Sequence, residues 1–239
     1  MLIPFNEPID LGAYQPRSSD LGDQVRAMLV PASYVPDITD SIRRAAADPL
    51  TKLVHIDLGD GHQWWHTRLF LVAALAEDYA RIESLVFHAT RGATPHCYVG
   101  SARPGPTRLA LAAVTPDLQV AYSAGQQQAA ALQHRPLHSV DAVDAAIAGF
   151  SANLPVEEGN LKIDVNEMVL RVWLGSDLIT DSIPAPADPG AAIPRRDLPA
   201  ILARPEQYVA LTKDQQLVQV VDRAELASRL ALAAVNQLG

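Results

Sequence analysis

The chain has 239 residues, a formal net charge of −8 and a single cysteine. Because 49% of its residues are apolar, it can form a packed core, which excludes a wholly disordered chain. One cysteine excludes an internal disulfide framework and cysteine-based zinc modules, and it fits a reducing cytoplasm. The acidic balance, with no basic run longer than two residues, argues against nucleic acid as a partner.

Neither a targeting signal nor a membrane span is expected. The first residues carry no basic segment and no long apolar run, which excludes a secretory signal. The longest strongly apolar stretch, residues 69–76, is far shorter than the roughly 20 residues that cross a bilayer. Arginine outnumbers lysine 16 to 3, and alanine is abundant, which is typical of GC-rich bacterial coding. We expect a cytoplasmic, bacterial protein.

The first half of the chain predicts an arm followed by a strand–helix–strand unit. Residues 1–36 hold five prolines and predict an extended arm with a short strand at 27–30. A helix is expected from Asp37 to Asp48-Pro49. Apolar spacing then predicts a strand at 52–57, a helix buried on two sides at 64–79, a second strand at 83–88 and a third strand at 97–100.

The second half predicts helices and one hairpin. Thr115-Pro116-Asp117 is typical of a helix start, and a further helix is expected at 140–150. The pair Asp164 and Glu167 resembles a capping box for a helix ending near Gly175. Six prolines make 181–205 an irregular stretch, and two β-rich runs around 213–215 predict a hairpin before a last helix that starts at Asp222.

These elements predict an α/β fold: a Rossmann-like, mostly parallel sheet with flanking helices, plus a smaller C-terminal α+β portion that contains the hairpin. The arm would cover 1–36, the α/β body 37–150, and the C-terminal portion 160–239. That last portion has modest apolar content and is expected to pack on the body as one domain or to stand apart.

The densest polar cluster lies between the first strand and the long helix. In open α/β sheets, ligands bind beyond the carboxyl ends of strands, so Asp57, Asp60, His62 and His66 are expected at that rim. His62 and His66 share a helix face and are predicted to bind a ligand, with Asp57 as a weak catalytic candidate. With Asp57 or Asp60 the two histidines could form a His/carboxylate metal site, but the Glu of an HExxH motif is missing, so we predict no metal. No cofactor is predicted either. Capping and surface roles explain the same residues equally well.

Two more strand ends add further candidates. His88 ends the second strand, and Ser101 follows the third; both are weak catalytic candidates beside Asp57. Arg91 and Arg103 are expected to hold a small anion such as a phosphate or nucleotide. No GxGxxG or P-loop pattern accompanies them.

Two side chains outside this rim need separate interpretation. Cys97 is the single cysteine, and its sequence neighbour His96 would point to the opposite face of a strand, so a buried apolar role is expected. Trp64 lies about 100° around the helix from the core-facing Trp65, and it is expected either to pack against the C-terminal portion or to be exposed for contact with a protein partner.

Two functions follow from this pattern. The preferred one is a non-catalytic interaction or assembly module with a protein partner or a second copy of the chain, since no catalytic motif is intact. The alternative is an enzyme or sensor that binds a small anionic ligand at the carboxyl ends of the strands. The pattern leaves enzymatic activity uncertain and favours its absence.

Overall fold

The computed structural model contains two compact units, of which the larger comprises residues 17–180 and the smaller begins at Asp181. The described residues are 17–20, 43–44, 50–61, 64–131, 140–154, 163–185 and 196–236, with backbone alone at 17–20 and 233–236. Most of the predicted arm, with its strand at 27–30, lies outside them, and so does His62. The predicted helix after Asp37 is described at residues 43–44, which are helical.

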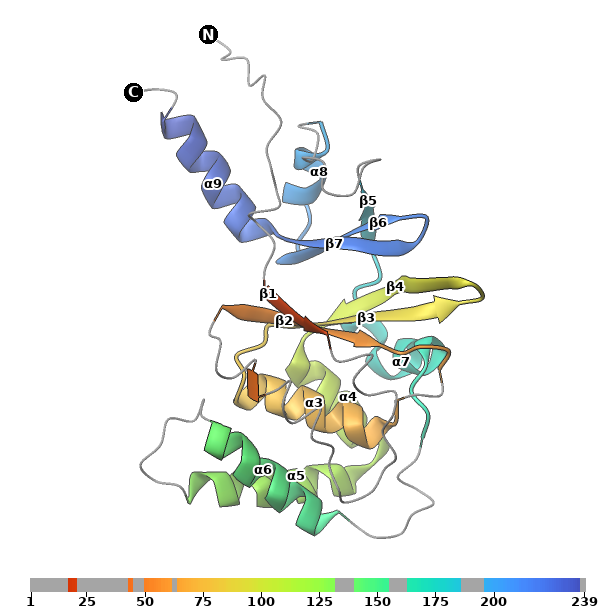
Figure 1. Cartoon of the computed structure of the whole chain (residues 1–239), viewed down its shortest axis with the longest axis vertical. Helices are drawn as coiled ribbons and strands as arrows, with labels where there is room; N and C mark the ends of the chain where they lie inside the picture. The colour runs from red at the N-terminus through yellow and green to blue at the C-terminus, as the bar shows by residue number, and fades with distance from the viewer. Residues whose placement is uncertain are drawn as a thin grey trace. The chain divides into compact units, whose positions relative to one another are not determined.

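The larger unit is built on a sheet with helices on one face (Figure 1). Its strands, in spatial order, are β1 (Arg17–Asp20), β2 (Thr51–Asp57), β3 (Ser84–Arg91) and β4 (Thr94–Ala102). The pairs β1–β2 and β2–β3 are parallel, whereas β3–β4 is antiparallel. Helix α3 (His66–Asp78) connects β2 to β3, so the structure contains the predicted strand–helix–strand unit.

The sheet is mixed, which fits the α/β class but leaves the Rossmann-like, mostly parallel sheet unconfirmed. The antiparallel pair arises because only Gly92 and Ala93 separate β3 from β4. Gly92 has a φ of 60°, a conformation that glycine adopts at little cost. A two-residue connection reverses the chain, whereas parallel neighbours need a long crossover. The strand predicted at 97–100 is therefore the return strand of a hairpin.

Helix α3 is buried along almost its whole length. Every residue from His66 to Ala76 is buried, as expected for a helix covered on two sides. Phe70 stacks on Phe150 and meets the edge of Tyr122, with ring centroids 5.8 Å apart in both pairs. These contacts join three helices, and the same core includes Val54 and Ile56 of β2.

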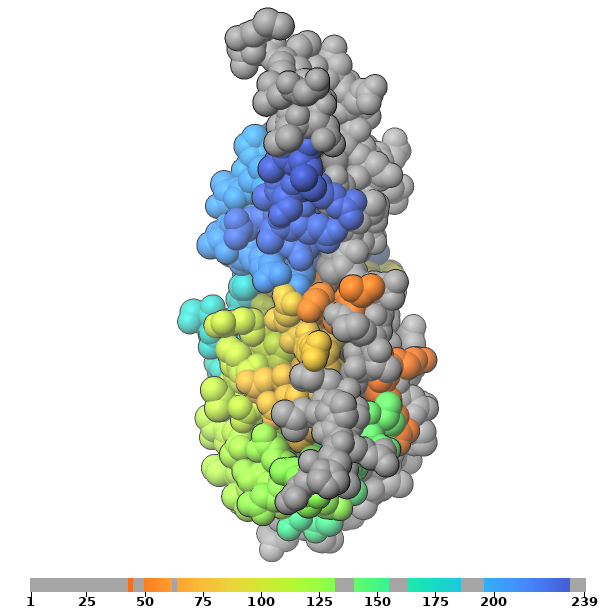
Figure 2. Space-filling view, turned by 90° about the vertical axis from the view of Figure 1, so that its left-hand side faces the viewer, coloured from red at the N-terminus to blue at the C-terminus, as the bar shows by residue number. Residues whose placement is uncertain are grey.

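Further helices complete this unit, and α4 and α5 form much of the surface facing the viewer in Figure 2. They are α4 (Pro104–Val114), α5 (Pro116–Ala130) and α6 (Val140–Asn153), of which α4 was not predicted. Helices α5 and α6 pack closely because two glycines meet: a Cβ on Gly149 would lie 2.6 Å from the Gly125 Cα. Within the described parts of the chain, none of the helices is long and apolar enough to cross a membrane.

Helix α7 (Glu167–Leu174) begins differently from the prediction. Asn166, not Asp164, caps it: the Asn166 Oδ1 accepts the Val169 N–H at 3.0 Å. The helix ends at Gly175, as predicted, with a φ of 51°. Because the two compact units divide at Asp181, α7 belongs to the larger unit, whereas the sequence placed it in the C-terminal portion.

The smaller unit contains three paired strands and a core of its own. Its elements are β5 (Ser182–Pro184), α8 (Leu198–Leu202), β6 (Tyr208–Lys213), β7 (Gln216–Asp222) and α9 (Arg223–Asn236). The structure contains the predicted hairpin, β6–β7, whose turn residues Asp214 and Gln215 have φ values of 50° and 69°, as in tight hairpin turns. Asp222 caps α9 as predicted, because its Oδ1 accepts the N–H groups of Ala224 and Glu225.

Candidate functional site

The carboxyl ends of β2 and β3 bring an aspartate and a histidine together. Asp57 is the register partner of His88 in the parallel pair, and 3.7 Å separates the Asp57 Oδ1 from the His88 Nδ1. Their sequence neighbours Ile56 and Phe87 belong to the core that contains α3. Because side chains alternate along a strand, Asp57 and His88 lie on the other face of the sheet. Both are almost fully buried, with 2% and 4% of their side chains exposed.

His96, from β4, completes the group. Its Nδ1 lies 3.3 Å from the Nδ1 of His88 and 3.9 Å from the Oδ2 of Asp57. About half of the His96 side chain (51%) is exposed, so this residue forms the solvent side of the cluster. The sequence did not indicate His96 as a site residue. Alternation of side chains along a strand was considered only to place His96 on the opposite face from Cys97.

The backbone at His96 explains how it reaches His88. Its φ is 54°, in the left-handed region that non-glycine residues adopt only at a cost of about 1 kcal/mol or more. The β3–β4 pairing also shifts register between Phe87 and His88, and again between Ala89 and Arg91. Such bulges and strained residues re-aim side chains and are common beside functional sites.

Asp57 is held firmly in this position. Its Oδ1 accepts the N–H of Gly59 at 2.8 Å, and its carbonyl accepts the indole N–H of Trp64, also at 2.8 Å. The carboxylate therefore has a fixed orientation, with the Oδ2 directed to His96. Trp64 itself is fully buried, so the exposed face expected for contact with a partner is not observed.

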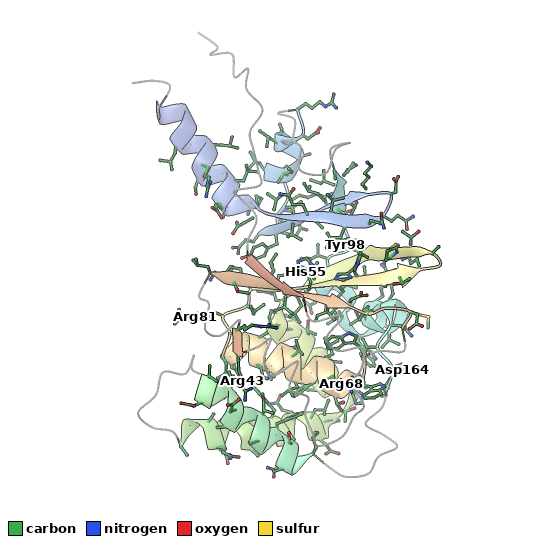
Figure 3. The ribbon with its side chains drawn as sticks, in the orientation of Figure 1. Arg43, His55, Arg68, Arg81, Tyr98 and Asp164 are labelled. Carbon is green, nitrogen blue, oxygen red and sulfur yellow. The ribbon has the colours of Figure 1, made fainter. Side chains whose placement is uncertain are left out.

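The neighbours of the cluster come from the same strands. The ring of His55, on β2, lies 6.0 Å from that of His88, and Tyr98, on β4, is the register partner of His88. The Tyr98 hydroxyl donates to the carbonyl of Ile179 at 3.0 Å. Figure 3 labels His55 and Tyr98 at the sheet and Arg68 at α3 on its other face.

Asp57, His88 and His96 have the donor atoms and spacing of a metal site. One ligand atom from each lies within 4.8 Å of the others. Two ligands about 2.0–2.1 Å from a tetrahedral zinc ion are about 3.3 Å apart. The two imidazole nitrogens already have this separation, 3.3 Å. Each of them lies within 4 Å of a different oxygen of the Asp57 carboxylate: the His88 Nδ1 is 3.7 Å from the Oδ1, and the His96 Nδ1 is 3.9 Å from the Oδ2. Two imidazoles and one carboxylate suit zinc and other first-row divalent metals.

His66 does not join this group. It begins α3, is fully buried, and accepts the N–H of Ile163 at its Nδ1 (3.3 Å). Its Nε2 therefore carries the proton and donates to the Thr115 Oγ1 at 3.1 Å. Burial lowers the pKa of His66 to about 4. His66 thus connects three segments of the fold and is not placed to bind a ligand.

The two predicted anion-binding arginines do not converge. The guanidinium of Arg91 forms a two-bond ion pair with Glu167, at 3.0 and 2.7 Å. Arg103 is exposed at the start of α4, where its carbonyl accepts the N–H of Thr107. Ser101 lies opposite Val86 on β4 and is buried, with its hydroxyl 3.4 Å from that of Tyr98.

Two other features lie near the cluster without belonging to it. Cys97 is buried, and its Sγ donates to the Thr94 carbonyl at 3.5 Å, which fits the predicted apolar role. A pocket of about 340 Å³ lies beyond the same strand ends, between the 58–61 turn and the start of α7, and Asp60 is among its lining residues. Its walls include Leu58 and Ala89, which belong to the helix-side core, so the pocket opens on the other face from Asp57 and His88.

Comparison with family models, curated proteins and solved structures finds no match for the chain.

Proposed function

We propose that this chain binds a divalent transition metal ion through Asp57, His88 and His96, and that it acts there as an enzyme or sensor for a small ligand. The observation that carries the proposal is the 3.3 Å separation of the two imidazole nitrogens, facing a buried carboxylate. The same separation also fits a direct hydrogen bond, in which one Nδ1 donates and the other accepts. A metal ion instead uses the lone pairs of both nitrogens and the negative charge of Asp57 together.

The place of the cluster supports the same function. Ligands of α/β proteins bind beyond the carboxyl ends of parallel strands, where Asp57 and His88 lie. In this respect the β2–α3–β3 unit would work as a Rossmann-like body does, although β4 runs the other way. As part of this proposal we place the protein in the cytoplasm, because its single cysteine needs no oxidising compartment.

The test is the affinity for zinc, measured by competition with a chromophoric chelator. We expect His96→Ala to weaken zinc binding by more than about 100-fold, since loss of a direct ligand exceeds the 10–100-fold effect of a supporting residue. Asp57→Asn keeps an oxygen for the Gly59 N–H but removes the charge, and we expect a similar loss. His55→Gln changes another histidine of the same strand pair and serves as the control.

The His55→Gln control shows whether the loss of zinc affinity is specific to the proposed ligands. If His55→Gln weakens zinc binding as strongly as His96→Ala, the metal is held by histidines in general and the proposed site is wrong. Circular dichroism of each variant separates a lost ligand from a lost fold. Equal zinc affinity of the wild type and His96→Ala would also reject the proposal.

A second proposal keeps the interaction module, without catalysis. Helix α7 exposes Met168 and Val172, by 70% and 75%, and these residues lie four apart on one helix face. Large exposed apolar side chains that share a face are typical of contact with another protein, here a second copy of the chain. Light scattering of the wild type and of Val172→Glu tests this: a monomeric wild type at high concentration would reject the second-copy interaction.

A further inference from the structure

The charges of the proposed site do not balance, and this inference rests on the proposed function. A divalent metal brings two positive charges, whereas Asp57 supplies one negative charge and the two imidazoles are neutral as ligands. The site would therefore carry a net charge of about +1. Asp57 and His88 are almost fully buried, so water screens this charge poorly.

The coordination shell is incomplete as well. Within the described part of the chain, the group contains three ligands, one fewer than tetrahedral zinc takes. Sites with three protein ligands and an open fourth position are typical of catalytic or ligand-binding metals, whereas structural sites are closed. Because His96 is half-exposed and the other two ligands are buried, an open position would face the His96 side, where solvent reaches the cluster.

The two arginines are not placed to compete with the metal for an anion. The Arg91 guanidinium is neutralised by Glu167 at 2.7 Å, and Arg103 is exposed just before α4. An anion near this sheet edge would therefore find its strongest positive charge at the metal. Oxygen atoms of carboxylates and phosphates bind zinc well, and such a ligand would bring the charge of the site to about zero or below.

We propose that the open position binds a small oxyanion, through an oxygen atom bonded directly to the metal. Asp57, His88 and His96 hold the metal, and the anion enters from the His96 side. This ligand is the chemical class of substrate or signal for the proposed enzyme or sensor. The arginines take no part in holding it.

Cobalt(II) makes the proposal measurable, because its visible absorption reports the number and kind of its ligands. The full chain is loaded with Co²⁺ and titrated with acetate, with inorganic phosphate and with the uncharged acetamide. We expect a saturable change of the cobalt bands with one or both anions and none with acetamide. Arg103→Gln should respond as the wild type does, within about twofold, as expected for a residue that is no ligand.

The possible outcomes separate the two proposals. If cobalt binds but neither anion changes its spectrum, the fourth position is closed; the oxyanion proposal is then wrong while the metal site stands. If Arg103→Gln abolishes the anion response, the arginine holds the anion and the direct bond to the metal is wrong. If cobalt does not bind at all, the metal site is wrong and the oxyanion proposal falls with it.

Discussion

Two buried histidines of the larger unit, His66 and His88, have opposite kinds of hydrogen-bonding surroundings. His66 meets one backbone N–H and one hydroxyl, so each ring nitrogen has a neutral partner of the matching kind. His88 instead turns its Nδ1 toward another histidine and a carboxylate. The first arrangement satisfies a neutral ring and joins segments of the fold. The second brings three possible ligand atoms within 4.8 Å of one another, a spacing that suits a cation. Partner type, and not burial, therefore separates a structural histidine from a candidate ligand.

Among the changes that test this comparison, the removal of His66 is expected to have the largest effect on the free energy of unfolding. We expect His66→Ala to lower the free energy of unfolding by about 2–4 kcal/mol, because it leaves a cavity and an unpartnered Ile163 N–H. Urea denaturation measures the change. Zinc affinity should stay the same, since His66 is outside the cluster. If His66→Ala lowers the zinc affinity without lowering the free energy of unfolding, His66 is a metal ligand and not a structural residue.

The second effect is a pH dependence specific to His66. Its pKa is about 4 in the folded chain and 6.5 in the unfolded one, so the unfolded chain binds more protons between these values. Stability therefore falls as the pH drops from 6.5 to 4, by up to about 3 kcal/mol from this residue.

The measurement is the difference between two stability profiles. Urea denaturation from pH 4 to pH 7 is compared for the wild type and His66→Gln, which cannot titrate. The variant is expected to be less stable at pH 7 and to have a flatter profile. Parallel profiles would contradict a lowered pKa for His66.

The smallest effect concerns the left-handed backbone at His96. Glycine adopts a φ of 54° without strain, whereas alanine does not. We therefore expect His96→Gly to be more stable than His96→Ala by about 0.5–1 kcal/mol, after allowance for the greater freedom of glycine in the unfolded chain. Thermal unfolding of the two variants measures this. If alanine is the more stable residue, the backbone at this position is not strained.

Periodic patterns predicted the regular elements of the larger unit well. The strand expected at 52–57 is β2, the helix expected at 64–79 contains α3, and the one expected after Thr115 is α5. These predictions depend only on the spacing of apolar residues along the chain, which differs between helices and strands. The pairing direction of β4 was less accessible, because it depends on the two-residue turn at Gly92.

The candidate site was predicted only in part. Asp57 and His88 follow from strand ends, a rule that needs only the order of the elements. His96 does not follow, since its side chain reaches His88 through a left-handed backbone that histidine seldom adopts. His66 lies on a helix, as predicted, but its hydrogen-bond partners Thr115 and Ile163 are distant in sequence. The Thr115 hydroxyl bonds His66, which explains why it does not cap α5.

The β3–β4 hairpin has a consequence for the kinetics of folding. His88 and His96 are eight residues apart and share this hairpin, so little loop-closure entropy opposes their meeting. In the proposed metal site, the ion would therefore bridge them while the rest of the chain is still unfolded. Such early binding would speed formation of the hairpin. It would also make the metal stabilise the native state less than its native affinity implies, because the unfolded chain would share part of that affinity.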